Sequence, residues 1–150
     1  MKSGVKAILI YQGKILLSLR DNKSDIPYPN MWDLPGGGCE EGESMEDSLR
    51  RELREELNIS PKRLLDLGIE TRIQESRGGR FLVYLEDQDV ERLKLGDEGQ
   101  KFEFFTLDQA LNLNMVPFLQ DFLKRNDKWL EATLEKGQEV NLDQVSLRHL

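Results

Sequence analysis

The stretch GGCEEGESMEDSLRRELREELNI, residues 37–59, decides the fold of this chain because it carries both the start and the stop of a helix. Ser44 is a favourable N-cap residue, and Asp47 follows it at the acidic capping-box position. Asn58 tolerates the left-handed conformation that ends a helix. We therefore predict a helix over residues 44–57. Its buried stripe repeats every four positions and comprises Met45, Leu49, Leu53 and Leu57.

Three glutamates of this helix lie on one face. Glu52, Glu55 and Glu56 are spaced i, i+3 and i+4, and on a helical wheel they flank the leucine stripe. We expect them at the edge of the core, where close carboxylates repel one another unless a cation binds among them. Hard oxygen ligands suit Mg²⁺ or Mn²⁺. The alternative is a solvated helix face, on which Arg51 and Glu55 form an ordinary i,i+4 pair.

A glycine-rich segment precedes the helix, since residues 34–38 read LPGGG. Glycines let the backbone approach a ligand closely, and the amides at a helix start attract anions such as phosphate. Three glycines alone are more often a simple turn. The segment therefore indicates a phosphate site only because it leads into the acidic helix.

Taken together, this part of the chain resembles the Nudix box, a pattern of glycine, glutamate and arginine at fixed spacing. The matching residues are Gly37, Glu43, Arg51, Glu52, Glu55 and Glu56, closed by the apolar Ile59. Asn58 stands where the family has glycine, and asparagine also tolerates a positive φ. The preceding hairpin, the lead-in from Trp32 to Pro35 and residues 97–100 are similar to the MutT-like branch of the family.

The resemblance implies an α+β fold, with a mixed β-sheet sandwiched between α-helices, and hydrolysis of a nucleoside diphosphate linked to another moiety. The groups that it implies as ligands of Mg²⁺ (or Mn²⁺) are the Gly36 carbonyl and the carboxylates of Glu52, Glu55, Glu56 and Glu98. It implies that Glu43, Arg51 and Gly37 support the loop on the helix. Glu52 is the expected general base and Glu98 is its rival, although Glu98 could also be a surface acid of a turn.

Five residues are candidates for contacting the substrate: Arg20, Tyr28, Trp32, Leu34 and Asn114. Arg20 matches a phosphate-facing arginine of the MutT-like branch, and the alternative is an ordinary arginine at a strand end. The next three could stack on a base near the cleft entrance or could pack as core or lid residues. Asn114 is placed where the C-terminal segment would reach the base edge. Cys39 matches no family function, and we expect a small buried filler.

The residues leave the substrate open. A nucleoside triphosphate, with an oxidised dGTP as one candidate, is the first hypothesis, and ADP-ribose or a nucleotide sugar is the second. The proline that commonly follows the box in the second group is missing from residues 73–76, as is the tyrosine of dinucleoside-polyphosphate hydrolases. A non-catalytic Nudix-fold regulator is the third hypothesis, but such proteins lose helix carboxylates that this chain keeps.

Bulk properties narrow the class of protein further. The 150 residues fit one domain, and the formal net charge of −7 argues against binding extended nucleic acid. Cys39 is the one cysteine and His149 the one histidine, so zinc sites and a disulfide are excluded and a cytoplasmic setting is expected. The N-terminus lacks a signal-peptide pattern, and no apolar run approaches the ~20 residues of a membrane span.

Patterns elsewhere predict the remaining elements. Lys6–Tyr11 and Lys14–Leu19 are expected to form a hairpin. Further strands are predicted at Leu67–Ile73 and Arg80–Leu85, flanking a turn at Ser76–Gly79, and at Lys101–Thr106. Helices are predicted at Leu107–Leu111 and at Val116–Leu123, the latter running on towards Trp129. Residues 126–150 are expected to form a weak helix and a tail of the same domain.

Overall fold

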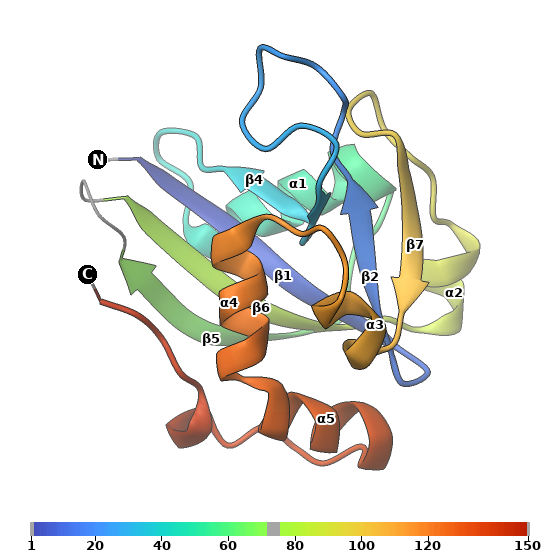
Figure 1. The fold of residues 1–150 in the computed structure, drawn as a ribbon, viewed down its shortest axis with the longest axis vertical. Coiled ribbons are helices and arrows are strands. Elements are labelled where there is room, and N and C mark those ends of the chain that lie inside the picture. Colours follow the sequence, from blue (N-terminus) through green and yellow to red (C-terminus); the bar gives the residue numbers. More distant parts are fainter. Residues whose placement is uncertain (1, 72–75, 150) are drawn as a thin grey trace.

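In the computed structural model of this chain, residues 2–71 and 76–149 are described, and they form one mixed sheet with helices on both faces (Figure 1). The strands are β1 Ser3–Tyr11, β2 Lys14–Leu19, β3 Trp32–Asp33, β4 Gly36–Gly38, β5 Arg63–Thr71, β6 Arg77–Tyr84 and β7 Lys101–Phe105. The helices are α1 Met45–Leu57, α2 Asp87–Glu91, α3 Leu107–Leu111, α4 Pro117–Arg125 and α5 Asp127–Lys136, with a short 3₁₀ helix at Leu142–Gln144.

The strand order is β3-β2-β1-β6-β5, with β4 pairing to β1 and β7 pairing to β2. β1 and β6 run parallel, whereas the other neighbours pair antiparallel. The predicted hairpin is confirmed, because Leu9 of β1 lies opposite Leu16 of β2 and Gln12-Gly13 forms the turn at positive φ. In this arrangement β4, the glycine strand, lies beside the start of β1, at one end of the sheet.

Helix α1 forms as its sequence predicts. The Ser44 hydroxyl accepts a hydrogen bond from the Asp47 amide at 3.1 Å, and Asn58 ends the helix at φ 59°. Three leucines of the stripe are fully buried and pack with Val5, Leu9 and Phe81 of the sheet: Leu49, Leu53 and Leu57. Burying a leucine contributes about 1.5–3 kcal/mol, so this stripe fixes α1 on the sheet.

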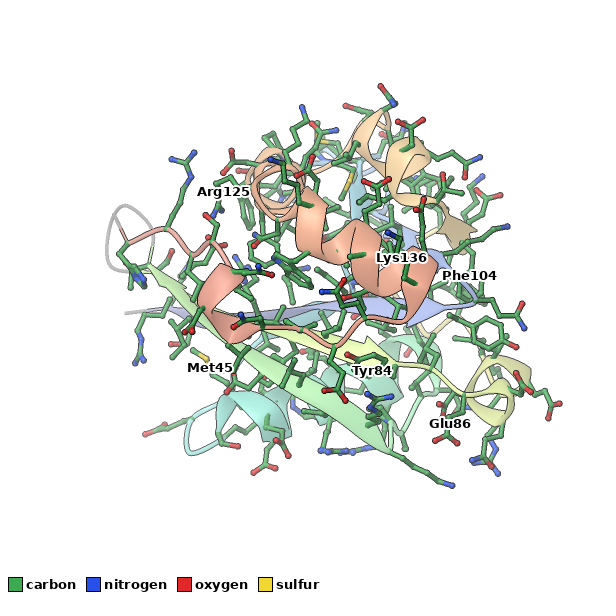
Figure 2. All side chains as sticks on the ribbon, turned by 90° about the horizontal axis from the view of Figure 1, so that it is seen from below. Met45, Tyr84, Glu86, Phe104, Arg125 and Lys136 are labelled. Carbon is green, nitrogen blue, oxygen red and sulfur yellow. The ribbon has the colours of Figure 1, made fainter. Side chains whose placement is uncertain are left out.

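The opposite face of the sheet is covered by α4 and α5, and side chains fill the space on both faces (Figure 2). Strand alternation divides the residues of β1 between the two layers. Leu9 belongs to the layer under α1, whereas Ile8 and Ile10 pack with Phe122 and Leu130 in the other layer. No helix among residues 2–71 and 76–149 is both long and apolar enough to cross a membrane.

The predicted turn at Ser76–Gly79 is wrong, because Arg77, Gly78 and Gly79 are the first residues of β6. They pair with the start of β1, where Val5 lies opposite Gly79. The glycine serves a close approach rather than a turn, since a Cβ on Gly79 would lie 2.7 Å from the Met45 sulfur. Of the strand predicted at Leu67–Ile73, the last two residues lie outside the described residues, and β5 begins earlier, at Arg63.

The helix predicted to run from Val116 towards Trp129 is broken at Asn126, where α4 ends and α5 begins. The Asn126 amide group donates to the carbonyls of Phe122 and Ser146. Its side-chain oxygen accepts from the Trp129 indole at 2.7 Å and from the Ser146 amide at 2.7 Å. The break therefore results from a buried amide that serves two chain segments. Helix α2 was not predicted from the sequence.

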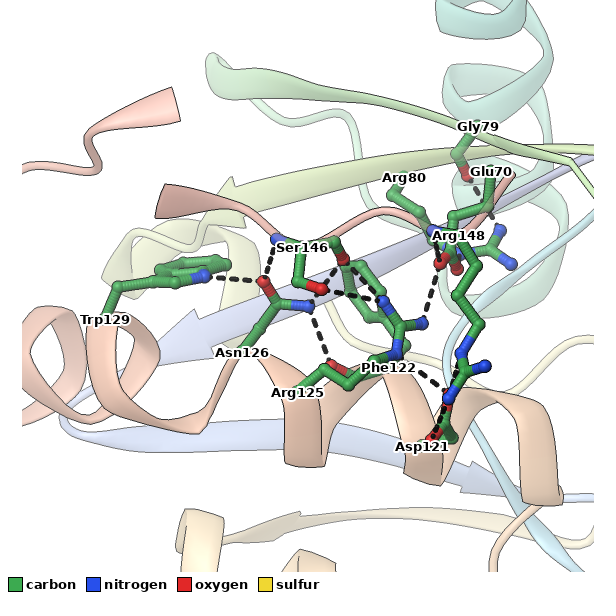
Figure 3. A network of polar contacts seen from close by, with 10 residues as sticks. All are labelled: Glu70, Gly79, Arg80, Asp121, Phe122, Arg125, Asn126, Trp129, Ser146 and Arg148. Carbon is green, nitrogen blue, oxygen red and sulfur yellow. Dashed lines mark hydrogen bonds and ion pairs between the residues drawn. The ribbon is translucent and has the colours of Figure 1, made fainter. Parts of the chain in front are cut away.

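A polar network ties the C-terminal segment to the sheet (Figure 3). Glu70 of β5 is buried, and its Oε1 accepts from Arg80 at 3.1 Å. Its Oε2 accepts from the Arg125 guanidinium at 2.7 Å and from the Arg148 backbone amide at 2.9 Å. Asp121 adds an ion pair to the Arg148 side chain. These contacts hold residues 146–148 against β5 and α4, on the face opposite α1.

Candidate active site

The residues around the glycine strand line a cleft of about 550 Å³. Its walls come from the end of β2, the following loop, β4, α1 and the loop that precedes β7. Seven of the residues singled out from the sequence line it: Arg20, Gly36, Gly37, Arg51, Glu52, Glu56 and Glu98. This volume falls within the usual range for small-molecule sites, so the cleft is large enough for a nucleotide.

Glu56 of α1 is half-buried in this cleft, and its Oε2 accepts a hydrogen bond from the Gly36 amide at 3.1 Å. Burial raises the pKa of Glu56 to about 7, because desolvation penalises the ionised form, although the nearby Lys6 lowers it in part. A carboxylate in such a place is poorly stabilised as an anion by the protein alone. A bound cation would stabilise it, and this agrees with a role as a metal ligand.

Glu52 lies one turn earlier in α1, against the backbone of Gly37. A Cβ on Gly37 would lie 2.6 Å from the Glu52 carboxyl carbon, so a larger residue would displace that carboxylate. Glu52 also accepts a hydrogen bond from Arg51 at 2.9 Å. The requirement for glycine at residue 37 is therefore steric, and it concerns the position of one carboxylate.

Arg51 and Glu43 form a two-pronged ion pair, with Nε to Oε2 at 2.8 Å and Nη2 to Oε1 at 2.9 Å. Arg51 Nη2 also donates to the Gly38 carbonyl at 2.9 Å. The hydrogen bonds from Arg51 lower the pKa of Glu43 to about 2. The structure thus brings this pair together between loop and helix, where the resemblance places it.

The Glu55 side chain points away from the cleft. Its side chain is 61% exposed, does not line the cleft and contacts Arg51 Nη1 at 3.3 Å. Across residues 2–71 and 76–149, no three acidic, histidine or cysteine side chains converge closely enough to hold a metal ion. The donors that do line the cleft are all hard oxygens, from Gly36, Glu52, Glu56 and Glu98. Their chemistry fits Mg²⁺ or Mn²⁺, and Glu55 would have to leave Arg51 to join them.

Glu98 reaches the cleft because its loop is attached to the end of α1. The amides of Lys94 and Gly96 donate to the carbonyls of Leu57 and Glu56 at 3.1 and 2.9 Å. A Cβ on Gly96 would lie 2.1 Å from the Glu55 carbonyl oxygen, so this close approach requires glycine. The exposed Glu98 side chain is thereby carried to the same cleft as Glu52.

The other residues predicted to contact the substrate fall into two groups, one in the core and one outside the cleft. Leu34 is fully buried in the core under α4, so its interpretation as a base-stacking residue is wrong. Trp32 packs edge-to-face on Phe105, with ring centroids 4.9 Å apart, and Tyr28 lies edge-on to Phe118. Asn114 is exposed, and its carbonyl accepts from the Trp32 amide. Tyr28, Trp32 and Asn114 do not line the cleft.

Cys39 is half-buried, unpaired and packed beside the core layer under α1, in keeping with the expected filler role. The sequence analysis did not assign several other cleft residues to the site, among them Lys6, Ser18 and Asp33. Ser18 lies 3.5 Å from Glu56 Oε1. The available signal for the other two was a charged residue inside an apolar segment, since Lys6 interrupts Val5–Tyr11 and Asp33 separates Trp32 from Leu34.

Comparison with known proteins shows the family of this chain. A family model described as the NUDIX domain matches residues 2–125. An ADP-ribose pyrophosphatase of Methanocaldococcus jannaschii is 34% identical over 124 residues, which are 80% of this chain and 72% of that protein. The nucleoside triphosphatase NudI of Salmonella typhimurium is 37% identical over 82 residues, which are 47% of this chain and 55% of that protein.

Solved structures share the fold. A mutT/nudix family protein from Listeria innocua superposes with a TM-score of 0.71 at 24% identity, covering 91% of this chain and 96% of that one. The E. coli ORF135 protein, solved in solution, gives 0.64 at 27% identity, covering 83% and 86%. The chain belongs to the NUDIX domain family. It is a MutT-like Nudix hydrolase, an enzyme acting on phosphorus anhydrides, and the predicted α+β fold is confirmed.

Proposed function

We propose that this enzyme is a metal-dependent nucleoside triphosphate pyrophosphohydrolase, which releases a nucleoside monophosphate and pyrophosphate. The observation that carries the proposal is the single cleft in which Glu52, Glu56, Glu98 and the Gly36 carbonyl meet. Substrates linked through a pyrophosphate bring several negative charges into this acidic cleft. A cation must therefore enter with them, and Mg²⁺ is our choice, with Mn²⁺ as a substitute.

We propose roles for the cleft residues that were singled out from the sequence. The carboxylates of Glu52, Glu55, Glu56 and Glu98, with the Gly36 carbonyl, would hold the metal. When bound, the metal supplies neutralisation of phosphate charge and a bound water of lowered pKa. Glu52 is our proposed general base, because the backbone of Gly37 confines its carboxylate, and Glu98 is the rival. Glu43 and Arg51 hold the glycine strand in place, and Arg20 contacts a phosphate.

The base of the substrate needs contacts outside the phosphate cleft. The Trp32 amide donates to the Asn114 carbonyl, and Tyr28 packs on Phe118. We propose that Trp32, Tyr28 and Asn114 contact the base from outside the phosphate cleft. Leu34 has no part in this, because it is buried.

ADP-ribose or a nucleotide sugar is the second candidate substrate class. The observation that favours it is the similarity to an ADP-ribose pyrophosphatase, which extends over more of this chain than the similarity to NudI. The missing proline after the box argues the other way. The two classes differ in the product, because only a triphosphate yields pyrophosphate.

We further propose that residues 126–149 act as part of the same domain as the sheet. Trp129 and Leu130 of α5 are buried in the core under α4, which supports this. A cytoplasmic location is also proposed, on the single unpaired Cys39.

A screen of phosphate release tests the proposed function. Nucleoside triphosphates, ADP-ribose, nucleotide sugars and dinucleoside polyphosphates are each incubated with the protein and Mg²⁺, and matched reactions contain a chelator. Products are identified by mass spectrometry in ¹⁸O-labelled water, which shows which phosphorus was attacked. Pyrophosphate release from a triphosphate, lost with the chelator, is the expected result. Turnover of ADP-ribose alone would replace the first candidate with the second.

A further inference from the structure

Two cations share one buried carboxylate in the cleft, close to Glu56 of α1. Lys6 Nζ lies 2.9 Å and Arg20 Nη1 3.0 Å from the same oxygen, Asp33 Oδ2. The Asp33 side chain is 7% exposed, whereas those of Lys6 and Arg20 are 18% and 27% exposed. All three residues line the cleft. The group therefore presents one more positive than negative charge to whatever binds there.

The hydrogen-bonding capacity of this group is only partly used. Asp33 Oδ1 is buried and has no hydrogen-bond partner in the described parts of the chain. The Lys6 ammonium carries three donors, and beyond Asp33 its contact is the Gly36 carbonyl at 3.5 Å. Both cations thus lie on one oxygen and retain donors that no protein group occupies at short range. Such donors suit an anion in the cleft.

The position of Lys6 in β1 is costly for a lysine. Strand alternation puts it on the same side as Ile8 and Ile10, which are buried in the core. An apolar residue would satisfy that packing, and lysine is seldom buried without a partner. The pairing of Lys6 with Gly36 across β1 and β4 places its ammonium beside the glycine strand, where it faces Glu56. The ion pair with Asp33 stabilises the ammonium there, and the Lys6 side chain also lines the cleft.

We propose that Lys6 is a substrate-binding residue which, together with Arg20, binds a phosphate group of the substrate beside the glycine strand. Asp33 orients the two cations without neutralising both. The inference rests on the proposed function and deepens it, because it adds to Arg20 a second cation for the phosphates of the substrate.

Inorganic pyrophosphate is a probe of this pair that does not depend on turnover. Its affinity is measured by calorimetry in Mg²⁺ for the wild-type protein and for Lys6→Met, which keeps the stem and removes the charge. Loss of one charge-assisted hydrogen bond is expected to weaken binding about tenfold or more. Lys6→Arg should restore most of the affinity. The matched control is Lys14→Met, an exposed lysine at the start of β2, and it should bind like the wild type.

Kinetics give a second readout. Lys6→Met is expected to raise KM about tenfold or more for the substrate that the screen identifies, with kcat changed less, whereas Lys14→Met should leave KM within about threefold. A change in kcat alone would overturn the assignment of Lys6 to substrate binding. Unchanged pyrophosphate affinity in a folded Lys6→Met protein would overturn the role in phosphate binding.

The wild-type protein provides a test that survives a folding defect in the variant. Lysines are acetylated with and without pyrophosphate, and the modification of Lys6 and Lys14 is quantified by mass spectrometry. Protection of Lys6 but not of Lys14 is expected, and equal modification of Lys6 in both samples rejects the inference. This result is independent of the substrate screen. A protein that hydrolyses no nucleotide but protects Lys6 would refute the proposed function and retain the anion site.

Discussion

The candidate active-site cleft and the network around Glu70 use the same residue types in opposite ways. In the network, both oxygens of Glu70 have partners, from Arg80, Arg125 and the Arg148 amide (Figure 3). In the cleft, Asp33 gives one oxygen to two cations, and its other oxygen has no hydrogen-bond partner among residues 2–71 and 76–149. Glu56 is half-buried with a raised pKa. The first group is satisfied by the chain itself and stabilises the fold. The second group is arranged for ligands.

This difference has a thermodynamic meaning. A buried polar group that is fully paired holds the structure, whereas one that lacks partners costs stability until a ligand supplies them. The Glu70 network joins four segments of the chain: β5, β6, α4 and the C-terminal residues (Figure 3). The cleft is stabilised instead by its surroundings, through the buried stripe of α1 and the Arg51–Glu43 pair.

The largest expected effect is on catalysis, from Glu56→Gln. The amide oxygen of the substituted side chain can still accept from the Gly36 amide, but it cannot supply an anionic ligand, so we expect kcat/KM to fall by about three orders of magnitude or more. In the metal-free protein the same change should raise the melting temperature at pH 8, because it removes a poorly solvated charge. Activity within about twofold of the wild type would reject Glu56 as part of the metal site.

Glu70→Gln should have the opposite signature. It leaves buried Arg80 without its carboxylate, and breaking a buried ion pair costs about 3–5 kcal/mol of the free energy of unfolding. Turnover per folded molecule at low temperature should stay close to that of the wild type. Denaturant unfolding and steady-state kinetics on the same sample measure both. Glu131→Gln, an exposed position on α5, is the control and should change neither. A stable Glu70→Gln protein with lost activity would remove the contrast between the two regions.

A smaller effect is expected from adding one methyl group to the glycine strand. In Gly37→Ala the new Cβ would meet the Glu52 carboxylate at 2.6 Å and displace it, so we expect kcat to fall roughly 10- to 100-fold. Gly38→Ala is the matched control, because no atom lies within 4 Å of its Cβ and its φ is not positive. The two variants should melt within a few degrees of each other. Equal activity in both would show that the position of Glu52 is not critical.

The smallest and most specific effect concerns pH. The pKa of Glu56 in the folded chain is raised to about 7, above its ordinary value of 4.5. The folded state therefore holds this proton more tightly than the unfolded state, and its contribution to stability is full below pH 4.5 and lost as pH rises to 7. In chelator, the free energy of unfolding of the wild type should fall relative to Glu56→Gln across that window, by about 1–3 kcal/mol.

Denaturant unfolding at pH 4.5, 6 and 8 measures this difference between the two proteins. Mg²⁺ added at pH 8 should recover stability in the wild type and not in the variant. A difference that stays constant with pH would mean that Glu56 is not the group responsible.

The sequence by itself determined the elements whose cues are local. The hairpin, α1 with its N-cap and left-handed stop, and the short helix α3 follow from residues adjacent in the chain. Membership of the family followed from the spacing of Gly37, Glu43, Arg51 and the three glutamates. These predictions succeeded because helix caps, turn residues and the helical repeat depend on residues only a few positions apart in the chain.

Only the tertiary structure decided the features that depend on contacts between distant segments. Gly79 suggested a turn and instead makes room for Met45, and Asn126 breaks a continuous helical pattern because it bonds to Ser146. Lys6 and Asp33 meet at the cleft because β1 and β3 belong to one sheet. Long-range packing and charge pairing set these outcomes, and no local periodicity encodes them.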